Sequence, residues 1–286
     1  MTILVTGAKG MIGSQLVKGL LAAGYTVVGI DRSSDTSCGG QYFHHMCDLN
    51  DKDRLQIIFD NYKIDRIIHL AALAHATGGK SMPYELYHHL NVECANNIFQ
   101  MAKERDIPIL FISTVDVYGF VKGTVDGNTE CNPITFYGKT KRQAELNLCS
   151  CGARYNIFRF SPVYTKEVKR DIQKRIYLKY PKIAYQIGKN TQYEVLDINE
   201  AVRNMVEWCS ADPDNTIKVI KDKNLLNTVD YIAAEKAEGR ANTVIRIPRW
   251  MVVAGYSVLR ISGKNKFTFL INKAVSPLRS RDYVEE

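Results

Sequence analysis

A tyrosine and a lysine near the middle of the chain have the types and the spacing that proton transfer requires. Tyr137 and Lys141, in the segment YGKTK, stand at positions i and i+4 of an expected helix and therefore share one of its faces. A phenol is a weak acid with an unperturbed pKa of about 10, and a neighbouring ammonium group lowers that pKa by favouring the phenolate. The pair therefore predicts proton exchange at an alcohol or a carbonyl group.

Two hydroxyl side chains precede this pair at the end of an expected strand over residues 109–113. Ser113 and Thr114 would face the ligand crevice, because the carboxyl ends of parallel strands line it. We expect Thr114 to hold the substrate oxygen beside Tyr137, and Ser113 to lie against a cofactor. The alternative is that both hydroxyls only cap the end of the strand.

Three glycines at the start of the chain form a candidate phosphate cradle. Gly7, Gly10 and Gly13 follow an apolar strand over residues 3–6 and open a helix over residues 11–23. Glycine permits a tight turn and a close backbone approach to a pyrophosphate, while N–H groups at the helix start hold the anion. The residues between the glycines complete the expected cofactor loop: Lys9, Met11 and Ile12. A purely structural turn is the alternative.

The second strand, over residues 26–30, is followed by an acid that indicates which dinucleotide binds. A carboxylate at Asp31 would bond the hydroxyls of an adenosine ribose and repel a 2′-phosphate. NAD is therefore favoured over NADP, although Arg32 could offset that repulsion or stack on the adenine. Two further segments fit the same cofactor: Asp48-Leu49, and the small residues that end the next strand, Leu70-Ala71-Ala72.

The elements that would position these residues alternate along the first half of the chain. Strand patterns alternate with helices over residues 51–61, 86–105 and 136–149, which predicts an α/β fold with a doubly wound parallel sheet. After Pro162 the pattern becomes irregular, with a basic helix over 168–180, short strands and a helix over 198–209. We expect a dinucleotide-binding domain over 1–165 with a return segment near 190–221, and an interleaved substrate-binding or lid region over 166–286.

The composition of the chain favours a cytoplasmic protein with an anionic ligand and without a metal site. The formal net charge of the 286-residue chain is +8, which suits an anionic ligand, and no nucleic-acid-binding motif accompanies it. The seven cysteines are scattered, so they predict free thiols in a cytoplasmic protein, and no spacing of histidines or cysteines predicts a metal site. The N-terminus shows no secretory signal, and the late apolar stretch over residues 250–259 is too short to span a bilayer.

In order and spacing, these motifs resemble those of the extended short-chain dehydrogenase/reductases, within the NAD-dependent epimerase/dehydratase branch that acts on nucleotide sugars. The resemblance covers roughly residues 1–165. It is carried by TGAKGMIG over 6–13, Asp31, Asp48-Leu49, HLAA over 69–72, Asn91-Val92, STVDVYG over 113–119 and YGKTK over 137–141. A weaker similarity continues over residues 159–164 and 195–198.

The resemblance implies a Rossmann-type fold, NAD as cofactor, and Thr114, Tyr137 and Lys141 as catalytic residues, with Lys141 also bonding the nicotinamide ribose. It adds further cofactor-binding residues, namely Asn91, Phe160, Pro162 and Val163, and it places the substrate near Ala74, His75 and Asp116. The implied substrate is a sugar linked to UDP, GDP or dTDP. The implied reaction is hydride transfer at C4, by a 4-epimerase or a 4-keto-sugar reductase.

Two departures from the family pattern shape this expectation. No arginine stands in the segment 188–193, where many members grip the diphosphate, so Lys189 or a basic residue of the tail would replace it. Val115-Asp116 stands where dehydratases carry an Asp-Glu pair, which argues against 4,6-dehydration. The chain is also shorter than typical 4-epimerases, and this length with the reduced substrate region favours the short epimerases and reductases of bacterial surface-polysaccharide pathways.

Several alternatives stay open at this point. The chain could be a short-chain reductase of a non-sugar carbonyl, or a non-catalytic NAD-sensing protein of the same fold. A homodimer is compatible with the sequence. The tail over residues 249–281 is expected to form lid helices over the substrate, and a membrane contact through its basic residues is the less favoured interpretation.

Overall fold

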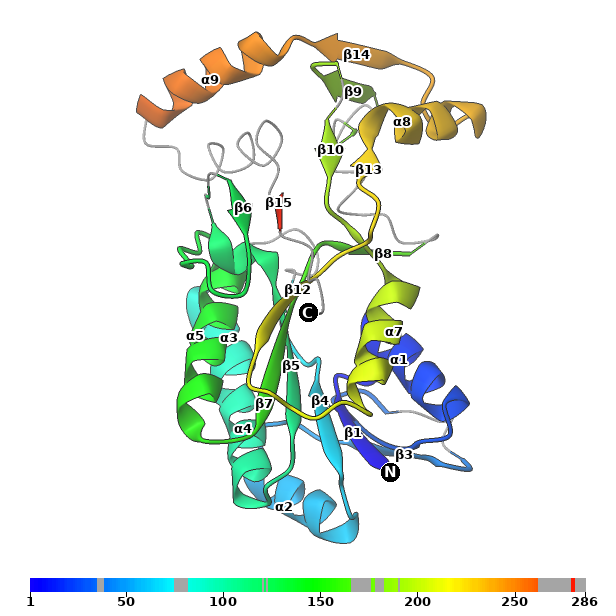
Figure 1. Ribbon diagram of the computed structural model, residues 1–286, viewed down its shortest axis with the longest axis vertical. Coiled ribbons are helices and arrows are strands. Elements are labelled where there is room, and N and C mark those ends of the chain that lie inside the picture. Colours follow the sequence, from blue (N-terminus) through cyan, green and yellow to red (C-terminus); the bar gives the residue numbers. More distant parts are fainter. Residues whose placement is uncertain are drawn as a thin grey trace. The chain divides into compact units, whose positions relative to one another are not determined.

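The protein divides into two compact units, seen here in a computed structural model (Figure 1). The structure describes residues 1–34, 39–74, 82–119, 121, 123–165, 176–177, 183–189, 191–261 and 279–280. The first unit comprises residues 1–119, 127–160 and 198–220, and the second comprises 120–126, 161–197 and 221–286. The chain crosses between the units several times.

A seven-stranded parallel sheet forms the centre of the first unit, in the order β12-β7-β5-β4-β1-β2-β3. The strands are β1 (Thr2–Thr6), β2 (Thr26–Asp31), β3 (Tyr42–Met46), β4 (Arg66–His69), β5 (Ile109–Thr114), β7 (Tyr155–Phe160) and β12 (Ile217–Ile220). The central strands are buried on both faces, which requires their nearly continuous apolar sequences. The predicted α/β fold is confirmed.

Helices cover both faces of this sheet (Figure 1). On one face, α1 (Met11–Ala22) packs against α7 (Ile198–Trp208). On the other face lie α2 (Lys52–Asn61), α4 (Cys94–Glu104) and α5 (Phe136–Cys151). The main core fills the space between these three helices and the sheet, and its apolar side chains come from both layers.

The helical region before β5 is not one regular helix. The sequence predicted a single helix over residues 86–105, whereas the structure shows α3 (Tyr84–His88), a π-helical turn η2 (His89–Glu93) and then α4. A π-turn lengthens the helical hydrogen bonds by one residue and changes the face that its residues present. Asn91 lies in this turn and is buried.

The order of strands reverses between β1 and β4. Strands β2 and β3 extend the sheet on one side of β1, and β4, β5, β7 and β12 extend it on the other. In open α/β sheets, ligands bind in the crevice at the carboxyl ends of the strands where the order reverses. The glycine loop follows β1 and the segment Leu70-Ala71-Ala72 follows β4, so both expected cofactor segments lie at this reversal.

The described part of the second unit contains short paired strands and the helices α8 and α9. The elements are β6 (Thr124–Val125), β8 (Val163–Tyr164), β9 (Ala184–Ile187), β10 (Gln192–Tyr193), β11 (Leu196–Asp197), β13 (Leu226–Asn227), α8 (Thr228–Ala237), β14 (Val244–Ile247), α9 (Arg249–Ile261) and β15 (Arg279–Ser280). A small core includes Ile176, Tyr193 and Ile232. Of the helix predicted over 168–180 only residues 176–177 are described, and there Tyr177 forms a β-bridge with Ala184.

Three findings concern the part of the chain that the structure describes. No helix in it has the length and apolar character needed to cross a membrane. No group of histidine, cysteine, aspartate and glutamate side chains in it could hold a metal ion. The six cysteines within it are free thiols.

Candidate active site

The glycine loop and the end of β4 are in close backbone contact. Gly7 has a φ of 71°, a conformation that favours glycine, and a Cβ there would lie 2.9 Å from the backbone nitrogen of Ala71. A Cβ on Gly13 would lie 2.1 Å from the carbonyl oxygen of Gly7. Helix α1 can therefore begin directly against the loop only because residue 13 is glycine, which brings the helix N-terminus to the carboxyl edge of the sheet.

A buried hydrogen bond joins β1 and β4 beneath this loop. Thr6 Oγ1 and His69 Nδ1 are 2.9 Å apart, and the Ala71 N–H donates to Thr6 Oγ1 at 3.3 Å. Burial, assisted by the nearby Lys141 charge, lowers the pKa of His69 to about 3, and its ring stacks on Phe111. His69 is therefore neutral at physiological pH and positions the loop, a role that the sequence did not reveal.

The carboxylate of Asp31 is oriented beside the glycine loop. Its Oδ2 accepts a hydrogen bond from Lys9 N at 3.1 Å, and its Oδ1 accepts one from Ser33 N at 3.0 Å. A carboxylate held at this place suits the ribose hydroxyls of NAD and opposes a 2′-phosphate. Arg32 follows it on the exposed surface.

The other residues expected on the adenine side have structural contacts of their own. Asp48 Oδ1 accepts a hydrogen bond from Asn50 N at 2.9 Å in the turn before α2. Leu49 has its side chain in the main core, and its carbonyl oxygen accepts a hydrogen bond from Asn97 Nδ2 at 2.8 Å. At the start of α1, Met11 is exposed and Ile12 is half-buried. Any contact of Leu49 with a cofactor would therefore involve its backbone.

Thr114 is adjacent to the first turn of α5, which carries Tyr137. Thr114 Oγ1 accepts a hydrogen bond from Asp116 N at 3.2 Å and so caps the 3₁₀ turn η3 (Val115–Tyr118). A Cβ on Gly138 would lie 2.7 Å from the Asp116 carbonyl oxygen, so the glycine after Tyr137 lets the two turns touch. Thr114 thus caps the turn after its strand, which is the alternative role that the sequence left open. The turn that it caps is the one that contacts α5 beside Tyr137.

Lys141 is buried with its charge over an aromatic ring. Its Nζ lies 3.8 Å from the centre of the Phe111 ring, which attracts a cation. Burial lowers the pKa of Lys141 to about 7, while the Glu145 carboxylate one helical turn further acts in the opposite direction. A change of pH around neutrality therefore changes the charge that Lys141 offers to its surroundings.

Asn91 connects the loop after β4 to α5. Its Oδ1 accepts a hydrogen bond from Leu73 N at 2.7 Å, and its Nδ2 donates to Leu73 O at 3.1 Å and to Thr140 Oγ1 at 3.0 Å. Thr140 immediately precedes Lys141. The resemblance implied a cofactor contact for Asn91, and the structure shows its amide holding the backbone of the β4 loop against α5.

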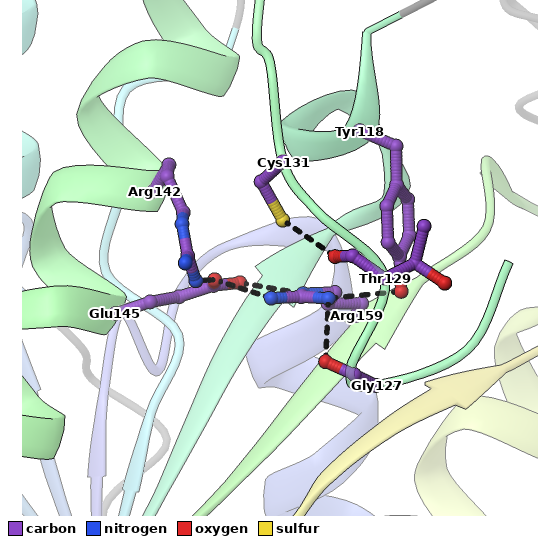
Figure 2. Close-up of polar contacts among 7 residues, drawn as sticks. All are labelled: Tyr118, Gly127, Thr129, Cys131, Arg142, Glu145 and Arg159. Atoms are coloured by element: carbon purple, nitrogen blue, oxygen red, sulfur yellow. Dashed lines mark hydrogen bonds and ion pairs between the residues drawn. The ribbon is translucent and has the colours of Figure 1, made fainter. Parts of the chain in front are cut away.

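A buried ion pair joins α5 to β7 (Figure 2). The Glu145 carboxylate accepts hydrogen bonds from Arg159 Nε at 3.0 Å and Nη2 at 2.8 Å, and both side chains are almost fully buried. Arg142, whose side chain is 28% exposed, donates to Glu145 Oε2 at 2.8 Å. Burial alone would raise the pKa of Glu145, but the hydrogen bonds and charge of Arg159 outweigh it, so the pKa lies below its ordinary value.

Arg159 also reaches the segments around Thr114. Its Nη1 donates to Tyr118 Oη at 2.9 Å and to the Gly127 carbonyl oxygen at 3.1 Å, and in the sheet it is paired with Ser113 of β5. Figure 2 shows the guanidinium at the centre of these contacts. The motifs of the sequence did not reveal this role, although an arginine inside the apolar strand β7 and an acid one turn after Lys141 were the signals for it.

The remaining expected residues fall in different places. Phe160 ends β7 and is buried in the first unit. Pro162 and Val163 belong to the second unit, where β8 pairs with β11. Ala74 ends the described part of the β4 loop, and His75 lies outside the described residues. The first unit therefore holds the glycine loop, Asp31, the β4 loop, Ser113, Thr114, Asp116, Tyr137 and Lys141 on the carboxyl side of its sheet.

Comparison with known proteins explains this arrangement. Residues 3–212 match the profile of the NAD dependent epimerase/dehydratase family. The chain belongs to this family. The motif-based resemblance is thereby confirmed, and with it NAD as cofactor. The first unit fits NAD because the start of α1 offers backbone N–H groups for the phosphates and Asp31 offers a carboxylate for the ribose.

Two relatives illustrate the extent of the similarity. The chain is 30% identical to the probable low-salt glycan biosynthesis reductase Agl14 of Haloferax volcanii over 165 residues, which cover 57% of this chain and 54% of that protein. It is 29% identical to the UDP-glucose 4-epimerase of Drosophila melanogaster over 188 residues, which cover 57% and 53%. The matched region thus spans little more than half the length of these relatives.

Solved structures share the fold over most of the chain. The UDP-glucuronic acid 4-epimerase from Bacillus cereus in complex with NAD matches 87% of this chain and 88% of its own, with a TM-score of 0.71 and 24% identity. MoeE5 in complex with UDP-glucuronic acid and NAD matches 87% and 86%, with a TM-score of 0.70 and 22% identity. At these identities the likeness demonstrates the fold.

The contact between Gly13 and Gly7 predicts a binding defect. We expect Gly13→Ala to weaken NAD binding at least tenfold and to lower the free energy of unfolding by roughly 1–3 kcal/mol, because the new methyl group displaces α1 from the loop. Isothermal titration and urea unfolding measure the two effects. Gly39→Ala is the control, since a Cβ there meets no atom within 4 Å. Wild-type NAD affinity in Gly13→Ala would contradict the packing described for α1.

The buried ion pair predicts unequal effects of two arginine substitutions. We expect Arg159→Met to lower the free energy of unfolding by about 3–5 kcal/mol, because Glu145 stays buried without its main partner. Arg142→Met removes a more exposed partner of the same carboxylate and should cost less than about 1 kcal/mol. Urea unfolding near pH 7 compares them.

The same pair has a pH signature with a definite sign. In the wild type the folded-state pKa of Glu145 is depressed, so its contribution is present at neutral pH and is lost as pH falls. In Arg159→Met, burial would raise that pKa, and protonation would then relieve the isolated charge. The loss in free energy of unfolding caused by Arg159→Met should therefore become smaller as pH falls toward about 4. An equal loss in Arg159→Met and Arg142→Met at all pH values would contradict the role given to the Glu145–Arg159 ion pair.

Lys141 predicts a gain of stability when its charge is removed. The pKa of Lys141 is about 7 in the folded protein and ordinarily 10.5, so its protonation favours the unfolded chain. This destabilisation is complete below about pH 7 and diminishes as pH rises toward 10.5. We expect Lys141→Met to raise the free energy of unfolding by a few kcal/mol near pH 6 and by less near pH 9. Urea unfolding at the two pH values measures this difference. A gain that does not depend on pH would show that desolvation of the charge is not its cause.

Proposed function

We propose that this chain is an NAD-dependent oxidoreductase acting at C4 of a nucleotide-activated sugar, as a 4-epimerase or a 4-keto-sugar reductase. The observation that carries the proposal is the placement of Thr114, the Tyr137 turn and buried Lys141 on the same side of the sheet as the glycine loop. Two relatives support it by their descriptions, one as a UDP-glucose 4-epimerase and one as a probable glycan biosynthesis reductase.

The chemistry divides between the cofactor and the protein. NAD, when bound, supplies the acceptor or donor of a hydride at the sugar carbon. Tyr137 takes the proton of the C4 hydroxyl as that carbon is oxidised, and returns it when the carbonyl is reduced. Thr114 holds the same oxygen. An epimerase completes both halves on one sugar, whereas a reductase carries out only the second half.

Lys141 and Glu145 set the charge around the tyrosine. A protonated Lys141 on the same helix face favours the phenolate form of Tyr137. Burial lowers the pKa of Lys141 to about 7 even though the Glu145 carboxylate acts in the opposite direction, so Glu145 helps the ammonium group to stay protonated near neutral pH. The buried ion pair that holds Glu145 therefore also serves proton transfer.

The substrate class rests on the family and on the net charge of the chain. A formal net charge of +8 suits a diphosphate-linked sugar. We assign the diphosphate contact to Lys189 or to a basic residue of the tail, in place of the arginine absent from residues 188–193. The Val115-Asp116 sequence after Thr114 argues against 4,6-dehydration. Bacterial surface-polysaccharide precursor synthesis in the cytoplasm is the setting we propose, and the free thiols suit a reducing compartment.

Two other functions compete with this one. A short-chain reductase of a non-sugar carbonyl would use the same three residues but accept no nucleotide sugar. A non-catalytic NAD-sensing protein would have no need of Thr114, Tyr137 and Lys141 together, and their joint presence on one side of the sheet favours an enzyme.

The proposal predicts that Tyr137→Phe lowers kcat on the true nucleotide sugar by about 10²- to 10⁴-fold, because the proton-transfer group is lost. Affinity for NAD should stay within about twofold of the wild type, since the substitution removes no glycine-loop contact. Tyr25→Phe, which removes a hydroxyl just before β2 at the opposite end of the strands, is the control and should leave kcat unchanged. A fully active Tyr137→Phe would show that the mechanism is wrong.

Epimerase and reductase are distinguished by the state of the purified protein. An epimerase regenerates its cofactor in every turnover, so NAD should be released when the protein is denatured. A reductase would yield little nucleotide and would consume NADH or NADPH in the presence of a 4-keto sugar. Failure of both assays with UDP-, GDP- and dTDP-sugars would remove the nucleotide-sugar proposal in favour of a non-sugar carbonyl.

A further inference from the structure

Helix α9 of the second unit exposes an apolar surface. Trp250 is 71% exposed, Met251 50% and Val253 44%, and Ile245 of the preceding strand β14 is 42% exposed. These four side chains are called the α9 patch below. From Trp250 to Leu259 the helix sequence contains no charged residue. A helix that is apolar on all sides is stable in water only when its outer face is covered, so the α9 patch indicates a binding surface.

The charge around the α9 patch identifies what could cover it. Residues 239–281 contain no aspartate or glutamate and nine cationic residues, namely Arg240, Arg246, Arg249, Arg260, Lys264, Lys266, Lys273, Arg279 and Arg281. This segment therefore carries more positive charge than the net +8 of the whole chain. Arg246 and Arg249 are exposed beside the patch itself. The occupant should therefore combine apolar material with negative charge.

A second copy of the chain does not meet this requirement. Arg240 is already ion-paired with Glu235 and Glu238. In a two-fold symmetric dimer the same surface meets itself, so the exposed Arg246 and Arg249 of one protomer would face those of the other. An anionic lipid surface supplies both properties, because its headgroups attract arginine and lysine and its acyl region accepts tryptophan and aliphatic side chains.

We propose that the α9 patch, with Arg246 and Arg249 beside it, forms a peripheral membrane-binding surface that docks the protein on anionic phospholipid, with the helix lying in the plane of the interface. A helix of 13 residues is too short to span a bilayer but long enough to insert one apolar face into the headgroup region. The inference is independent of the reaction at the first unit.

The two tryptophans of the chain make this proposal directly measurable. Trp208 is buried and its indole Nε1 donates to Asn156 Oδ1 at 2.9 Å, whereas Trp250 is exposed on α9. A change in tryptophan emission on adding vesicles therefore reports on Trp250. The full-length protein is mixed with vesicles of phosphatidylcholine containing roughly one-third phosphatidylglycerol, and with vesicles of phosphatidylcholine alone, at low salt and at about 0.5 M salt.

We expect flotation with the anionic vesicles at low salt, a blue shift of Trp250 emission, and release at high salt. Trp250→Ser should weaken vesicle binding roughly tenfold by removing the largest apolar side chain of the α9 patch. Ile57→Ser is the matched control, since Ile57 of α2 is 58% exposed but lies in the first unit, and it should leave binding unchanged.

Three results would overturn the proposal. The first is no flotation with anionic vesicles at low salt. The second is flotation that Trp250→Ser does not weaken, because binding would then use another surface. The third is a concentration-dependent dimer in light scattering that disappears in Trp250→Ser, because a second copy would then be the occupant. The variant's far-ultraviolet circular dichroism and NAD affinity should match the wild type, so a folding defect is excluded separately.

Discussion

The ion pair between Glu145 and Arg159 is the interaction on which the candidate active site of the first unit depends. A charge buried without its partner is strongly destabilising, so α5 can pack on β7 only in the register that joins these two side chains. That register determines where the rest of the helix lies, including Tyr137, Thr140 and Lys141. The same guanidinium holds Tyr118 and the Gly127 carbonyl, which keeps the segment after Thr114 in place.

The proton transfer proposed for Tyr137 requires the charged form of Lys141, and burial makes that charged form unfavourable. Burial beside Phe111 lowers the pKa of Lys141, and Glu145 acts against that shift. Glu145 can do so only as a carboxylate, and Arg159 with Arg142 keep it ionised. A chain of alternating charges thus runs from β7 through α5 to the proposed proton-transfer group. The charge of Lys141 lowers the stability of the fold but is needed for the proposed proton transfer, and Glu145 makes that charge less unfavourable.

The cofactor side of the same sheet edge is organised by neutral contacts. Gly7, Gly13 and Ala71 bring backbone against backbone, and the Thr6–His69 hydrogen bond holds the two strands that carry them. His69 is neutral because it is buried, so this part of the site does not change with pH near neutrality. The Asp31 carboxylate adds a charge there and accepts hydrogen bonds from the Lys9 and Ser33 amides. The two sides meet through Asn91, which joins the β4 loop to Thr140.

The amino-acid sequence by itself determined the fold class and the family, and it predicted the glycine loop, Asp31, and the set of Thr114, Tyr137 and Lys141 as site residues. Each of these has a local signature: an apolar period, a glycine spacing, or two residues one helical turn apart. Sequence alone did not show that Leu49 is a core residue, that Asn91 holds a loop within a π-turn, or that His69 is neutral. These properties depend on which side chains surround each residue, and that is set by strand order and helix register.

Arg159 and Glu145 show most clearly why the sequence alone does not reveal such contacts. In the sequence they are an arginine in an apolar strand and a glutamate on a helix, separated by a loop, and nothing local pairs them. Only the packing of α5 on β7 removes both from water, and desolvation turns an ordinary charge pair into the contact on which the site's geometry depends. The exposed α9 patch is the converse, because its apolar sequence alone was equally compatible with a buried helix, and only the tertiary structure left it facing outward.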